Sequence, residues 1–224
     1  MKRKQIILAA GAVSVLCAGA VLAAQQQGPP PPMTFFVTSE TGTGNLGGLA
    51  GSDARCQRLA QAAGSPATRT WHAYLSTQGA NAVNARDRIG AGPWHNKNGV
   101  QIAANVADLH GDVQRDRNYM VADSALDENG QMVPGRLGRA EGQANEHDIL
   151  TGSDSLGRAL PAEMDATCNN WTSDSPMARA MLGHFDRSGG GNTSWNSAHM
   201  SAGCDVPLLA RTGGAGRLYC FAIN

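Results

Sequence analysis

The side chains best suited to chemistry lie between Cys168 and Cys204, in a segment with little helical or strand periodicity. Tryptophan rings stack on sugar rings, and Asn, Asp and Arg supply directional hydrogen bonds to a hydroxyl-rich ligand. Loops often present such functional groups. The candidate ligand-binding residues are Trp171, His184, Asp186, Arg187, Trp195, Asn196 and His199. The alternative is that both tryptophans fill the core of a domain in which only 5% of residues are aromatic.

Several of these residues could also bind a metal ion. His184, Asp186 and His199 combine imidazole and carboxylate groups, which suit zinc and related ions. Glu146, His147 and Asp148 offer a second set of nitrogen and oxygen ligands. The alternative for each histidine is a hydrogen bond within the structure, so the metal ligands stay unassigned.

A calcium loop is briefly suggested by residues 127–130, Asp-Glu-Asn-Gly. The segment lacks the further acidic positions and the terminal glutamate of an EF-hand, so we predict a turn there. A divalent ion such as calcium therefore has no motif in its support, and no cofactor is expected.

Common catalytic motifs are missing from the sequence. There is no Gly-x-Ser-x-Gly elbow, no His-Glu-x-x-His, no phosphate loop and no dinucleotide glycine fingerprint. We therefore predict a binding protein rather than an enzyme. The alternatives are a metal-dependent or His/Asp-dependent extracellular hydrolase, in which His184 and Asp186 could exchange protons, and an envelope structural or interaction protein.

The N-terminus has the pattern of a secretory signal. Lys2, Arg3 and Lys4 precede an apolar run, and small residues near Ala23 offer a cleavage site. We predict a signal peptide at 1–23, a Gln/Pro-rich spacer at 24–32 and one domain at 33–224, secreted or periplasmic. An uncleaved membrane anchor is the alternative. After cleavage no stable membrane span is expected.

Charge and cysteine content narrow the class further. Cleavage leaves 15 basic and 18 acidic side chains, a net charge of −3 that argues against a nucleic-acid partner. It also leaves four cysteines, which in an oxidising compartment predict two disulfides. The four are Cys56, Cys168, Cys204 and Cys220. With 28 glycines, the domain should be rich in loops.

Hydrophobic periodicity predicts the elements that hold these residues. A helix should begin at Ser52 as N-cap and end at Gly64, with Cys56 on its buried face. A strand at 217–223 is apolar on both faces, which is typical of a central strand. The other expected elements are strands at 33–38 and 70–76 and a short helix at 82–89.

Ordered motifs resemble those of endostatin, a collagen-derived domain. They are NLGGLAGSDARCQ at 45–57, WHAYLS at 71–76, SDSLGR at 153–158 and CNNW at 168–171. HDILTG at 147–152, GHFDR at 183–187 and SWNS at 194–197 resemble more closely a group of secreted bacterial proteins loosely labelled lectins.

The resemblance implies an α+β fold of the C-type-lectin-like class, endostatin-like, with a loop-rich mixed sheet and one or two helices. It implies nested disulfides, Cys56 with Cys220 and Cys168 with Cys204. The expected partner is a carbohydrate or another extracellular polymer, with an envelope protein as an alternative. Calcium-dependent lectins carry Glu-Pro-Asn or Gln-Pro-Asp and Trp-Asn-Asp, whereas this chain has only Trp195-Asn196-Ser197, so calcium-mediated sugar binding is not implied.

Overall fold

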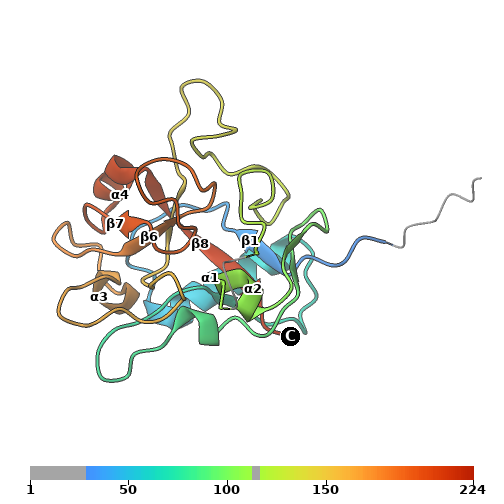
Figure 1. Cartoon of the computed structure of the whole chain (residues 1–224), viewed down its shortest axis with the longest axis horizontal. Coiled ribbons are helices and arrows are strands. Elements are labelled where there is room, and N and C mark those ends of the chain that lie inside the picture. The colour runs from blue at the N-terminus through green and yellow to red at the C-terminus, as the bar shows by residue number, and fades with distance from the viewer. Residues whose placement is uncertain (1–28, 113–116) are drawn as a thin grey trace, which may run out of the picture.

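A computed structural model describes residues 29–112 and 117–224. The predicted signal peptide and most of the predicted spacer lie outside these residues. The elements in chain order are β1 (Phe35–Val37), α1 (Gly48–Ala62), β2 (Trp71–Ala73), the 3-10 helix η1 (Ala85–Asp87), β3 (Trp94–His95), β4 (Gln101–Ala103), α2 (Val106–His110), β5 (Asp148–Leu150), α3 (Cys168–Trp171), β6 (Met181–His184), β7 (His199–Met200), α4 (Val206–Thr212) and β8 (Gly214–Ala222). The predicted α+β class with long loops is confirmed (Figure 1).

Strand β8 is the centre of the main sheet, as its two apolar faces predict. It pairs with β1 on one edge and with β2 and β5 on the other, and its pairs with β1 and β2 are antiparallel. The β5–β8 pair is parallel, and the sheet continues through β6 to β7. Strands β3 and β4 form a separate pair. The part of the chain that the structure describes contains no helix long and apolar enough to cross a bilayer.

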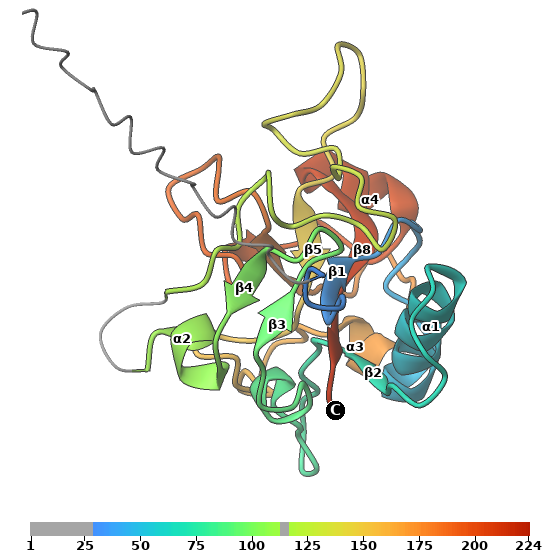
Figure 2. The same ribbon diagram turned by 90° about the vertical axis from the view of Figure 1, so that its right-hand side faces the viewer.

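The two faces of the main sheet bury two separate cores. Leu218 and Cys220 of β8 pack with residues of α1 and α4. Tyr219 and Phe221 face the other way and pack with Trp94, Ile102 and Leu109 from β3, β4 and α2. Figure 2 shows this layering, with α1 and α4 on one side of β8 and the β3–β4 pair and α2 on the other. Because both of its faces meet a core, β8 is apolar on both sides from Leu218 to Ala222.

The N-cap of α1 lies five residues earlier than predicted, at Gly47 instead of Ser52. Gly47, with φ of 74°, precedes the first turn. Ser52 is fully buried, and its hydroxyl donates a 2.8 Å hydrogen bond to the carbonyl of Gly48 inside the helix. A serine hydroxyl can form a hydrogen bond with the backbone either at an N-cap or inside a helix. The residue type therefore misplaced the start of the helix. The predicted short helix at 82–89 is a single 3-10 turn, η1.

Two disulfides join the layers with the nested pairing that the resemblance implies. Cys56 of α1 pairs with Cys220 of β8 across 164 residues, and Cys168 pairs with Cys204 across 36 residues. The first bridge ties a helix to the central strand. The second closes the segment that contains β6 and β7.

Element α3 is a left-handed turn. Its four residues, from Cys168 to Trp171, all have φ between 48° and 66°. Left-handed backbone costs roughly 1–2 kcal/mol for each residue with a Cβ. The turn is held by the disulfide at Cys168 and by Trp171, whose indole donates a 2.8 Å hydrogen bond to the carbonyl of Ser76.

Candidate metal centre

Strand pairing gathers three histidines and one aspartate at one end of the main sheet. Asp148, the first residue of β5, lies directly opposite His184, the last residue of β6. Opposite residues in an antiparallel pair point to the same face. His147 immediately precedes β5, and His199 on β7 pairs with Leu182 of β6. Residues up to 52 positions apart therefore meet.

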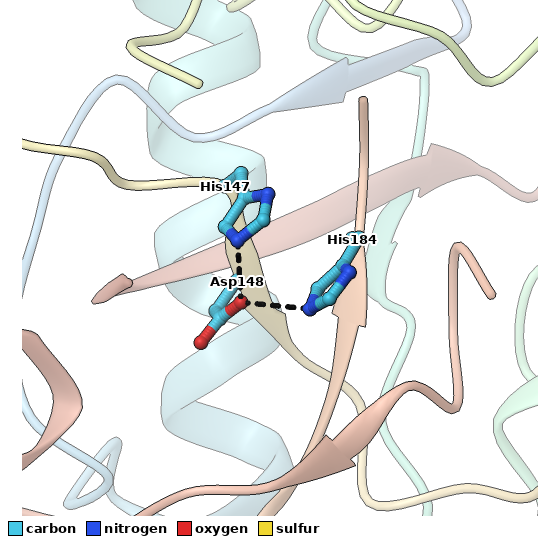
Figure 3. A group of neighbouring side chains, drawn as sticks. All are labelled: His147, Asp148 and His184. Atoms are coloured by element: carbon cyan, nitrogen blue, oxygen red, sulfur yellow. Dashed lines mark ion pairs between the residues drawn. The ribbon is translucent and has the colours of Figure 1, made fainter. Parts of the chain in front are cut away.

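All three imidazoles point to a single carboxylate oxygen. The Nε2 atoms of His147 and His184 each lie 3.2 Å from Oδ1 of Asp148, as Figure 3 shows. The Nε2 atom of His199 lies 3.6 Å from the same oxygen and 2.9 Å from Nε2 of His184. The rings of His147 and His184 stack with centroids 4.2 Å apart. One ligand atom from each of His147, Asp148 and His184 lies within 4.8 Å of the other two, so the three residues could hold one metal ion.

The carboxylate of Asp148 is buried without a well-directed hydrogen bond. Its side chain is fully buried, and within the described residues neither oxygen has a partner of good hydrogen-bond geometry, although three histidine nitrogens lie at ion-pair distance. Burial raises the pKa of Asp148, but the contacts with His184 and His199 outweigh burial and hold the pKa below its usual range. A buried anion of this kind needs a cation.

A second carboxylate orients His147 from behind. Oδ1 of Asp186 lies 3.0 Å from Nδ1 of His147, and Oδ2 accepts a 2.8 Å hydrogen bond from the backbone N–H of Arg136. Burial raises the pKa of Asp186, but the hydrogen bonds from His147 and Ser188 prevail and lower it to about 2. The ionised Asp186 therefore accepts a hydrogen bond from Nδ1–H of His147, which leaves the Nε2 lone pair facing Asp148. A carboxylate behind a histidine is typical of metal sites.

The structure brings together only part of the predicted ligand-binding set. His184 and His199 join the cluster, and Asp186 contacts it through His147 rather than as one of the converging groups. Arg187 donates from Nε to the carbonyl of Met120, and its guanidinium reaches Oδ1 of Asn118 at 2.6 Å. Asn196 is fully buried and donates to the hydroxyl of Tyr74 at 2.9 Å.

Both tryptophans of the predicted set are core residues, as the alternative interpretation expected. Trp171 is 0% exposed and Trp195 is 1% exposed. Trp171 packs in the core on the α1 side of the sheet, and Trp195 packs on the opposite side against Tyr74 and Tyr219. Neither ring presents a face on which a sugar could stack. In this chain, which has few aromatic residues, both tryptophan rings fill the core.

Two residues of the second predicted metal set belong to the cluster, and one does not. His147 and Asp148 supply the converging nitrogen and oxygen atoms. Glu146 forms an ion pair with Arg217 of β8, whose Nε lies 2.8 Å from the carboxylate. Residues 127–130 form a turn, as predicted, in which Oδ1 of Asp127 accepts backbone hydrogen bonds from Asn129 and Gln131.

No family model matches the chain, and no curated protein matches it either.

Proposed function

We propose that this chain is an exported domain with the C-type-lectin-like fold, and that His147, Asp148 and His184 bind a transition-metal ion. One observation carries the proposal: three imidazole nitrogens converge on one buried carboxylate oxygen that has no well-directed hydrogen bond. Nitrogen and oxygen ligands in this ratio suit zinc and its neighbours, whereas calcium takes oxygen ligands.

The fold name rests on the sequence resemblance together with two features of the structure. These are the nested disulfides and the position of β8, near the end of the chain, beside the early strand β1. Export rests on the N-terminal sequence and on the two disulfides, which persist in oxidising compartments.

In this proposal the domain is a binding module for a carbohydrate or another extracellular or envelope polymer, and the ion stabilises the segment between Cys168 and Cys204. Because both tryptophans are buried, exposed residues must make the contact. Thr172, Asp174 and Asn192 of that segment are exposed.

Metal content of the purified protein tests the proposal. We expect about one equivalent of zinc, or of cobalt or nickel supplied in its place, in the wild-type protein. His184→Ala should lose the metal, whereas His72→Ala should retain it. His72 is a suitable control because it contacts Arg88 and Asp53 at the other end of the domain. A folded wild-type protein that holds no ion after incubation with each metal would refute the site.

A glycan array with metal-loaded and chelated protein tests the binding role separately. Binding that disappears with the chelator would support a module stabilised by the ion. Hydrolysis of a test substrate by the loaded protein alone would favour the metal-dependent hydrolase, for which His199 is the partly exposed group beside the ion.

A further inference from the structure

We infer, on the basis of the metal site proposed above, that His199 becomes the fourth protein ligand of the ion. The ion would then be held by three imidazoles and one carboxylate, and its binding would fasten β7 to the sheet. His199 is not part of the group formed by His147, Asp148 and His184, whose ligand atoms all lie within 4.8 Å of one another.

Donor separations support this assignment. Around a tetrahedral zinc ion with bonds of about 2.0–2.2 Å, neighbouring donor atoms lie about 3.3–3.5 Å apart. His199 Nε2 lies 2.9 Å from Nε2 of His184 and 3.6 Å from Oδ1 of Asp148. These two separations lie on either side of the expected value. No ligand atom of His199 lies within 4.8 Å of all three inner ligands, so His199 must move toward His147 to bind a shared ion.

The hydrogen bonding of His199 leaves its Nε2 atom available. Its Nδ1 lies 3.1 Å from the carbonyl oxygen of Met200. A carbonyl only accepts hydrogen bonds, so Nδ1 carries the proton and, in the neutral ring, Nε2 carries the lone pair. Two imidazole nitrogens at 2.9 Å need either a proton or a cation between them. An ion would accept both lone pairs.

Position and exposure indicate that His199 is the ligand that moves. Its side chain is 38% exposed, whereas those of His147, Asp148 and His184 are at most 4% exposed. Strand β7 has two residues and, among the described strands, pairs only with β6 at the edge of the sheet. Short edge elements open at low free-energy cost. The three inner ligands are thus fixed by the sheet, and the fourth arrives from a movable strand.

The inference assigns the ion a structural role. Four protein ligands close the coordination sphere of zinc, as in structural sites, and leave no position for a reactive water. The ion would hold β7 against β5 and β6. Strands β6 and β7 belong to the segment whose outer ends are joined by Cys168 and Cys204. Ion and disulfide would together fix the loop at 187–198, whose exposed part is residues 190–193.

Cobalt substitution of the full chain, with His199→Ala and His95→Ala variants, tests the assignment. His95 is a matched control, because it is a partly buried histidine on the separate β3–β4 pair. Wild type and His95→Ala should show the strong visible absorption of four-coordinate Co²⁺. His199→Ala should still bind Co²⁺ through the inner three ligands, with at least about tenfold lower affinity and an altered spectrum. Added imidazole should restore that spectrum.

Two outcomes would overturn the inference, and they are distinguishable. If His199→Ala binds Co²⁺ with the affinity and spectrum of the wild type, His199 is not a ligand, although the proposed metal site stands. If the folded wild-type protein binds no Co²⁺ at all, the metal site itself fails. Near-ultraviolet circular dichroism of the variant establishes that its core is intact.

Discussion

Asp186 lies behind His147, with Oδ1 of the carboxylate 3.0 Å from Nδ1 of the imidazole, and so directs the opposite ring nitrogen to Asp148. This relationship predicts that Asp186→Asn weakens metal binding by about 10–100-fold, the usual effect of removing such a partner. Competition with a chromophoric chelator measures the affinity. Asp127→Asn is the control, because Asp127 is a buried carboxylate that holds the 127–131 turn instead. Equal affinities in the two variants would contradict the role of Asp186.

Addition of metal should raise the stability of the chelated protein. An ion that binds only the folded state contributes about 2.7 kcal/mol when present at 100 times its Kd. For a domain of this size that corresponds to a rise in Tm of about 5–10 °C. Differential scanning calorimetry should detect the rise with Zn²⁺ and not with Ca²⁺. An equal rise with Ca²⁺ would indicate an oxygen-rich site elsewhere.

Gly183, next to His184 on β6, should not tolerate a side chain. A Cβ at this position would lie 1.8 Å from the carbonyl oxygen of Trp195, so the backbone must shift. We expect Gly183→Ala to destabilise the domain by about 1–3 kcal/mol and to weaken metal binding by moving His184. Gly191→Ala is the matched control, because a Cβ there meets nothing within 4 Å. Urea unfolding of both variants measures the difference, and equal stability would contradict the close packing at Gly183.

The two disulfides should contribute by different amounts to the free energy of unfolding. On the loop-entropy account, Cys56–Cys220 stabilises the domain by roughly 4–5 kcal/mol and Cys168–Cys204 by about 3–4 kcal/mol. Replacing Cys56 and Cys220 by Ser should abolish accumulation of the protein. Replacing Cys168 and Cys204 by Ser should leave folded protein with impaired ligand and metal binding. Immunoblots of periplasmic and culture fractions, followed by metal titration, compare the two double variants. Reversed effects of the two replacements would contradict the assignment of a folding role to one disulfide and a binding role to the other.

Acid should destabilise the domain through His110. Burial lowers the pKa of this side chain, which accepts a 2.7 Å hydrogen bond from Tyr74 and lies 2.9 Å from the carbonyl of Val106. Below the ordinary pKa of about 6.5, the unfolded chain binds more protons than the folded one, so stability is lost as the pH falls through the lowered pKa.

Urea unfolding of wild type and His110→Gln between about pH 8 and pH 5 measures this effect. The advantage of the wild type over the variant should narrow as the pH falls. The comparison cancels the opposite contribution of His199, whose pKa is raised by its contact with Asp148. A constant difference would show that His110 does not titrate in this range.

Local patterns predicted the fold better than they predicted the site. The apolar run at 217–223 identified the central strand because a run apolar on both faces is visible in neighbouring residues. The sequence also suggested His147 and Asp148 as metal ligands, and separately His184 and His199. It did not show that these two sets of residues lie at one site. Their meeting depends on β5 pairing with β6 in the register that sets Asp148 opposite His184. That register is fixed by tertiary contacts and not by spacing.

Strand β8 follows all of its partners in the chain, and this order constrains how the protein is made. Strands β1, β2 and β5 have no common neighbour until residues 214–222 have been synthesised. A ribosome-bound chain that ends before Gly214 would expose both apolar layers, because each is completed by alternate residues of β8. Neither apolar layer can therefore be completed before the final segment is made, and the chain would still lack these layers if it were exported as proposed, during synthesis, through a narrow translocation channel.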